Sequence, residues 1–77
     1  MRASFTPREV MIPAIKESAA SFALIQNHPS GDPTPSQQDL EITHRFSKTG
    51  KTIEINMVDH IIIGGNNFFS FADEGLL

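Results

Sequence analysis

The stretch that most constrains this chain is a polar, turn-forming segment at residues 27–39, which reads NHPSGDPTPSQQD. Proline and glycine at this density end regular structure and fix or permit unusual backbone angles. The segment also contains His28 and Asp39, whose side chains are common metal ligands. We therefore predict a loop between two regular elements, with His28 at the end of a strand and Ser36 at the start of a helix. Such a loop would bring His28 and Asp39 together.

The residues before this loop predict a buried strand at residues 21–26, which read SFALIQ. Strand side chains alternate between two faces, so Gln26 and His28 point the same way if the strand continues to His28. After the loop, a helix is predicted from Ser36 to about Lys48, ended by Gly50 in a left-handed turn.

The predicted helix carries a carboxylate on its apolar side. Asp39 falls at helical spacing with Ile42, Thr43 and Phe46, so its side chain should face inward and needs a polar partner.

The rest of the chain predicts one more helix and two or three strands. Thr6-Pro7-Arg8-Glu9 is typical of a helix start with Thr6 as the N-cap. Residues 51–56 alternate and could form a short edge strand, and residues 57–63 predict a strand that is buried on both faces. The turn-forming residues 64–67 then allow residues 68–71 to return as an antiparallel strand.

Together these residues resemble a known family. The run from His28 to Asp39, followed by Thr43, the DHIIIG strand at residues 59–64 and the Ser70-Phe71 pair, resembles the RadC family, a bacterial branch of the JAB/MPN (JAMM) metalloprotease-like fold. A JAMM centre reads His-x-His, seven residues, Ser, two residues, Asp, and this chain fits everywhere except at Gln26, which takes the place of the first histidine. The resemblance implies an α/β, cytidine-deaminase-like domain, with a mixed sheet flanked by helices. Residues 1–77 would be its C-terminal portion, without the upstream strands.

The resemblance also implies a site. His28 and Asp39 would bind Zn²⁺, Ser36 would be a catalytic residue that helps bind the water or the developing oxyanion, and an upstream glutamate, for which no matching residue is found here, would be the general base. A capping role explains Ser36 nearly as well as catalysis does, because serine is a common N-cap that accepts a hydrogen bond from a backbone N–H of the first helical turn. Gln26 either offers its amide oxygen to the ion or hydrogen-bonds to Asp39, and we favour the hydrogen bond. A structural role is favoured for His60, and neither His60 nor His44 is expected to replace the missing ligand.

Three functions follow from these residues. The first is a zinc-dependent hydrolase of peptide or isopeptide bonds with an incomplete metal site, acting on an unknown protein or peptide. The second is a catalytically inactive MPN-type protein-interaction module, and the third is a DNA-repair-associated factor. The net charge of −3 and pI near 5.4 argue against nucleic-acid binding, because phosphate contacts depend on Lys and Arg.

Length and composition set further limits. A chain of 77 residues is one small domain whose stability is expected to be marginal, and a domain without its leading strands should self-associate through an exposed sheet edge. The chain has no cysteine, which excludes a disulfide framework and a thiolate metal site. It has no apolar run of membrane-spanning length and no signal-peptide pattern, so we expect a cytoplasmic protein without a membrane partner.

Overall fold

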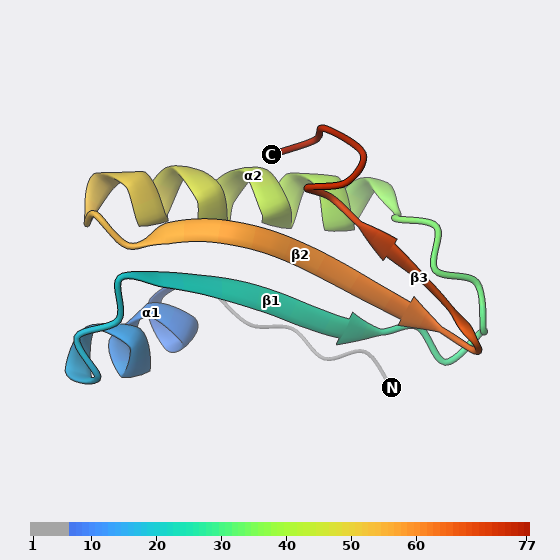
Figure 1. Ribbon diagram of the computed structural model, residues 1–77, viewed down its shortest axis with the longest axis horizontal. Helices are drawn as coiled ribbons and strands as arrows, with labels where there is room; N and C mark the ends of the chain where they lie inside the picture. Colours follow the sequence, from blue (N-terminus) through green and yellow to red (C-terminus); the bar gives the residue numbers. More distant parts are fainter. Residues whose placement is uncertain (1–6) are drawn as a thin grey trace.

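The computed structural model describes residues 7–77, which form two helices and three strands (Figure 1). The helices are α1 (Pro7–Lys16) and α2 (Gln37–Thr52), and the strands are β1 (Ser21–Asn27), β2 (Asn56–Gly64) and β3 (Asn67–Ser70). The proposed N-cap Thr6 lies outside the described residues. Neither helix of residues 7–77 is a candidate membrane span, by length or by hydrophobicity.

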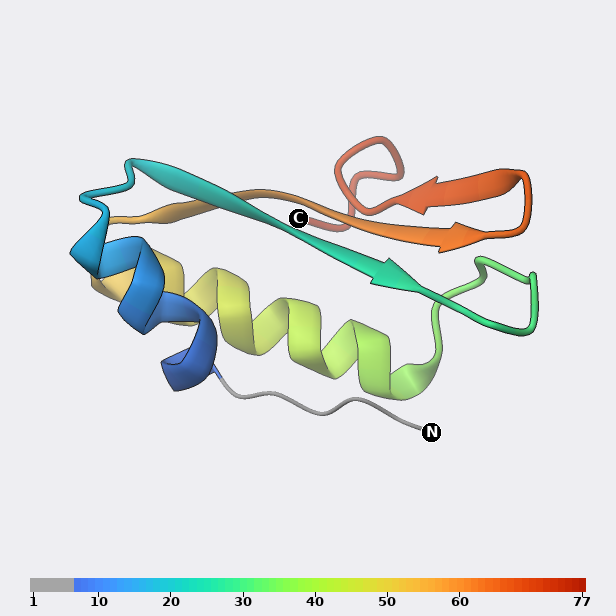
Figure 2. The same cartoon turned by 90° about the horizontal axis from the view of Figure 1, so that it is seen from below.

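The three strands form one mixed sheet in the order β1-β2-β3. β1 pairs with β2 in parallel, and β3 pairs with β2 in the antiparallel direction. Parallel neighbours need a crossover connection, and α2 supplies it here. Figure 2 shows both helices on the same side of the sheet, where α2 contacts β2 and α1 packs beside α2. The predicted α/β class with a mixed sheet is confirmed.

The core lies between α2 and the side of the sheet that faces it. The largest fully buried side chains are those of Phe46, Phe71, Ile62 and His60. The rings of His60 and Phe71 are stacked with centroids 4.8 Å apart, and the Phe46 ring lies 6.4 Å from that of Phe22. Full burial of one large apolar side chain contributes roughly 1.5–3 kcal/mol, so these few residues supply much of the stability of so small a domain.

The predicted end of the second helix is wrong. Gly50 lies inside α2, which continues to Thr52. A Cβ atom at residue 50 would collide with the backbone carbonyl oxygen of Ile55, so glycine is needed here for close packing and not to end the helix. The predicted edge strand at residues 51–56 is also absent, because the helix occupies its first part and a turn with Glu54 at φ 62° leads directly into β2.

The prediction that β2 is buried on both faces is wrong as well. Ile62 is fully buried, whereas Val58 and Ile63 are 54% and 39% exposed. Only one side of the strand faces α2. The predicted antiparallel return is confirmed, although β3 begins at Asn67 and not at residue 68.

Candidate functional site

The predicted loop follows β1 and lies against the end of β2. In β1 the alternation of side chains directs Gln26 inward, and His28 follows on the same side. The backbone N–H of His28 donates to the Ile63 carbonyl (2.8 Å), so the start of the loop is attached to the sheet. The N–H of Gly31, whose φ is 89°, then donates to the His28 carbonyl (3.0 Å) and closes a tight turn.

Gly64 at the end of β2 allows this loop to approach the sheet. A Cβ atom there would lie 2.6 Å from Pro33 N and 2.8 Å from the Asp32 carbonyl carbon. The loop has its own support, because the Asp32 carboxylate accepts hydrogen bonds from the N–H (3.0 Å) and the hydroxyl (2.7 Å) of Thr34. These bonds lower the pKa of Asp32 below its usual 3.8.

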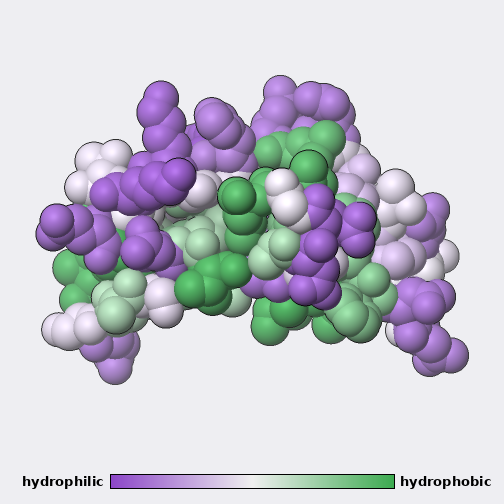
Figure 3. Space-filling view, turned by 45° about the horizontal axis from the view of Figure 1, so that its top comes forward, coloured by the Kyte–Doolittle hydropathy of each residue, from purple (hydrophilic) through white to green (hydrophobic). Residues whose placement is uncertain are grey.

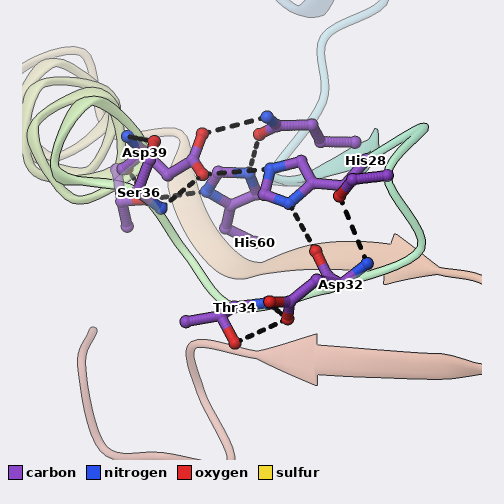
Figure 4. A network of polar contacts seen from close by, with 9 residues as sticks. His28, Asp32, Thr34, Ser36, Asp39 and His60 are labelled. Carbon is purple, nitrogen blue, oxygen red and sulfur yellow. Dashed lines mark hydrogen bonds and ion pairs between the residues drawn. The ribbon is translucent and has the colours of Figure 1, made fainter.

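Ser36 and Asp39 form a capping box at the start of α2 (Figure 4). The Ser36 hydroxyl accepts from the backbone N–H of Asp39 (3.1 Å), and the Asp39 carboxylate accepts from the backbone N–H of Ser36 (2.8 Å). The capping role proposed for Ser36 is therefore confirmed. The box fixes the Asp39 side chain, which is 5% exposed, toward β1.

His28 is held at both ring nitrogens. Its Nδ1–H donates to the Asp32 carbonyl oxygen (2.9 Å), and its Nε2 lies 3.1 Å from Oδ2 of Asp39. Because Nδ1 carries a proton, a neutral ring would direct a lone pair at the carboxylate, and the contact becomes a hydrogen bond only when the ring holds a second proton. A metal-ligating histidine is commonly oriented in the same way, by a backbone carbonyl on its other nitrogen.

Gln26 links this pair to the core. Its amide Nε2 donates to Oδ1 of Asp39 (2.9 Å), and its Oε1 accepts from Nε2–H of His60 (3.0 Å). The carboxylate can only accept, which fixes the direction of the amide and therefore the tautomer of His60. His60 Nδ1 is then an acceptor, and the Thr43 hydroxyl lies 2.6 Å from it and 2.8 Å from the Asp39 carbonyl.

The charges in this network follow from burial and hydrogen bonding. Burial alone would raise the pKa of Asp39, but hydrogen bonds from Ser36 and Gln26 and the nearby His28 outweigh it, so the pKa is lowered from 3.8. Burial lowers the pKa of His60 from 6.5, although the carboxylates of Asp39 and Asp59 oppose this. At neutral pH Asp39 is an anion and His60 a neutral donor and acceptor.

Comparison with known proteins identifies the family of this chain. The family described as the RadC-like JAB domain matches residues 1–76. The chain belongs to the RadC family. Among relatives, UPF0758 proteins of Trichlorobacter lovleyi and Geobacter sulfurreducens are each 55% identical over 71 residues, and one of Halalkalibacterium halodurans is 52% identical over 71 residues. Each match covers 92% of this chain and 31% of the relative, so the chain spans about a third of their length.

In this RadC-like domain the structure brings three of the predicted residues together. His28, Ser36 and Asp39 converge where β1, the loop and α2 meet (Figure 4). His44 is exposed, as expected for a residue on another face of the helix. The contact between Thr43 and His60 was not predicted, although the placement of Thr43 one turn after Asp39 on the inward side of the helix was a signal for it.

The residues of this RadC-like site do not fit a catalytic zinc ion. Such an ion takes three protein ligands, and His28 and Asp39 supply two. Among residues 7–77, no group of three His, Cys, Asp or Glu side chains could hold a metal ion. The fully buried polar side-chain atoms of the same residues all have a hydrogen-bond partner. Gln26 turns its N–H₂ group, which cannot bind a cation, toward Asp39.

Proposed function

We propose that this RadC-like JAB domain is a protein-interaction module that does not hydrolyse its partner. The observation that carries the proposal is the Gln26 amide, which donates to Asp39 and accepts from His60. The family pattern has a ligand histidine at this position. Here the side chain instead connects β1 to α2 and β2, so its role is to hold the fold together.

The chemistry supports the same proposal. Hydrolysis by a JAMM centre depends on a bound zinc ion that lowers the pKa of its water to about 7 and polarises the carbonyl. His28 and Asp39 alone do not complete such a centre. Ser36 is engaged at both its backbone N–H and its hydroxyl in the capping box, which accounts for this residue without catalysis.

A zinc hydrolase remains the second candidate because His28 is oriented as a metal ligand. Two ligands on a tetrahedral ion with bonds near 2.0–2.1 Å are separated by about 3.3 Å. His28 Nε2 and Asp39 Oδ2 lie 3.1 Å apart, close to that separation. A further ligand from a partner or a substrate would then be required. A role on nucleic acid is weakest, because the chain carries a net charge of −3.

Zinc titration of the metal-free protein tests the proposal. Calorimetry and elemental analysis should find no stoichiometric zinc, and unstructured peptides incubated with protein and zinc should stay intact by mass spectrometry. Asp39→Ala should behave like the unaltered chain in both assays. Stoichiometric zinc and peptide cleavage that are both lost in Asp39→Ala would overturn the proposal in favour of the hydrolase.

A further inference from the structure

A groove runs between α2 and the C-terminal tail, residues 71–77. After β3 the chain turns back, with the N–H of Leu76 donating to the Phe71 carbonyl (2.9 Å), and its end lies over the middle of α2 (Figure 1). The groove has a volume of about 230 Å³. We call it the tail groove, and its lining includes Leu40, Ser47 and Lys51 from α2 and Phe71, Leu76 and Leu77 from the tail.

The apolar lining of the tail groove is incompletely covered. Leu40 is 38% exposed, Leu76 50% and Leu77 45%. Figure 3, in which the α2 side of the molecule is turned toward the reader, shows hydrophobic surface near the middle of the view, with hydrophilic surface above it and on both sides. An apolar side chain that entered the groove would cover these leucines, and burial of apolar surface is the main favourable term in association.

Lys51 brings a positive charge to the tail groove. Within residues 7–77 the structure gives its ammonium group no ion pair and no hydrogen bond, and the nearest acidic residue in the sequence, Glu54, does not line the groove. Arg45 and Lys48 lie on the same half of α2, which therefore holds three of the six Lys and Arg residues of a chain with net charge −3. A cation in the last helical turn complements the helix dipole, but that role leaves its ammonium group open to a carboxylate.

The acidic residues of the tail lie away from Lys51. Asp73 and Glu74 are in its turn and do not line the groove. The N–H of Asp73 donates to the Ser70 hydroxyl (3.1 Å), which in turn donates to Asp59 (2.6 Å), so these carboxylates gather near the end of β3. Along α2 this turn is level with the N-terminal half of the helix, whereas Lys51 is in the last turn (Figure 1, Figure 2). A bound carboxylate is thus favoured at the Lys51 end of the groove and disfavoured at the other end.

We propose that the tail groove binds the C-terminal residue of a partner polypeptide, with a leucine-sized side chain between α2 and the tail and the carboxylate on Lys51. Sites for drug-sized ligands measure about 300–1,000 Å³, so a groove of about 230 Å³ suits a single residue, and a C-terminal residue combines side chain and carboxylate in the smallest unit. His44 and Ser47 also line the groove and can hydrogen-bond to the carboxylate or to the preceding peptide group. This binding site rests on the proposed interaction role, but zinc is titrated in a separate experiment, so either proposal can fail alone.

NMR titration of the unaltered chain with N-acetyl-leucine tests the proposal, with a chelator present to exclude binding through stray zinc. One side chain and one exposed ion pair give millimolar affinity, so additions up to about 20 mM are needed. Amide shifts should saturate and should be largest at Ser47, Lys51 and Leu76. N-acetyl-leucinamide lacks the charge and should bind about threefold more weakly. N-acetylglycine lacks the side chain and should bind at least tenfold more weakly.

Two lysine variants test the position of the carboxylate. Lys51→Gln should remove the preference for N-acetyl-leucine over its amide. Lys48→Gln is the matched control, because it removes the same charge from the same helix but from a residue that does not line the groove, and the preference should remain. Ser47→Leu fills the groove with a residue suited to helices and should abolish binding of N-acetyl-leucine.

The comparison of the three probes uses the unaltered chain, so it decides the matter even where a variant fails to fold. Absence of saturable binding of N-acetyl-leucine up to about 20 mM overturns the proposal. Equal affinities for N-acetyl-leucine and its amide do the same, as do shifts centred on another surface. A preference that Lys48→Gln removes and Lys51→Gln keeps also contradicts it.

Discussion

Replacing Gln26 by histidine should convert this site into a zinc site. Residue 26 lies on the inward side of β1, and its side chain already reaches Oδ1 of Asp39 (2.9 Å). An imidazole there would face the carboxylate and the Nε2 atom of His28, which lie 3.1 Å apart. Gln26→His would thus supply the third protein ligand of a catalytic zinc site and leave a position for water.

The size of the effect can be estimated from the number of ligands. Structural zinc sites with four ligands bind with about 10–16 kcal/mol, or roughly 3 kcal/mol for each ligand. One added ligand therefore raises zinc affinity by a factor on the order of 100. The substitution also removes the hydrogen bonds of Gln26 to Asp39 and His60, which should destabilise the metal-free protein by about 2 kcal/mol. Zinc should restore stability, because it binds the folded state more tightly than the unfolded chain.

Calorimetric titration with zinc of the unaltered chain, Gln26→His and Asn27→His measures the change. Asn27→His introduces the same side chain one residue further along β1, on the exposed side of the strand, and should bring no gain. Asp39→Ala in the Gln26→His background should abolish the gain. Equal zinc affinities for Gln26→His and Asn27→His would refute the assignment of residues 26, 28 and 39 to one centre.

Three further outcomes are expected. Ser36→Ala should lower the free energy of unfolding by about 1 kcal/mol in urea titrations, since the N–H of Asp39 loses its acceptor. Gly64→Ala should cost about 2 kcal/mol and shift the amide resonances of the loop, because the added Cβ collides with loop backbone. The pKa of His60 is lowered in the folded state, so its contribution to stability is present above about pH 6.5 and is lost as the pH falls through the folded pKa. Urea titrations at pH 7.5 and 5.5 should show this loss, and it should shrink in His60→Gln but persist in His44→Gln, where the ring is exposed.

The sequence was a good guide to local structure around the loop. The density of proline and glycine predicted the loop itself, and helical spacing predicted the inward position of Asp39. The alternation of side chains along a strand predicted that Gln26 and His28 share a side. The predicted hydrogen bond between Gln26 and Asp39 is also present. Each of these properties depends on residues close together in the sequence.

Properties that depend on distant residues were predicted poorly. Glycine is a residue type that often ends helices, which is why Gly50 was predicted to end α2. Its actual role is set by the Ile55 carbonyl that packs against it. The apolar run of β2 predicted burial on both faces. The sequence of a strand does not show whether a second layer of structure covers its other face, and here Val58 and Ile63 are exposed. The bond between Gln26 and His60 joins residues 34 positions apart, on neighbouring parallel strands, and no local pattern reports it.

Among residues 26–39, Gln26 alone accounts for how the site differs from the JAMM pattern. An imidazole has only two nitrogens. A histidine at position 26 therefore could not donate to Asp39 Oδ1, accept from His60 and bind a metal ion at the same time. The glutamine amide makes the first two contacts and cannot make the third. The buried His60 would lose a partner if the ligand histidine were restored, unless its ring proton found another acceptor. Metal binding and the continuous hydrogen-bond chain from Asp39 to Thr43 are therefore alternatives at this position, and this chain has the hydrogen-bond chain.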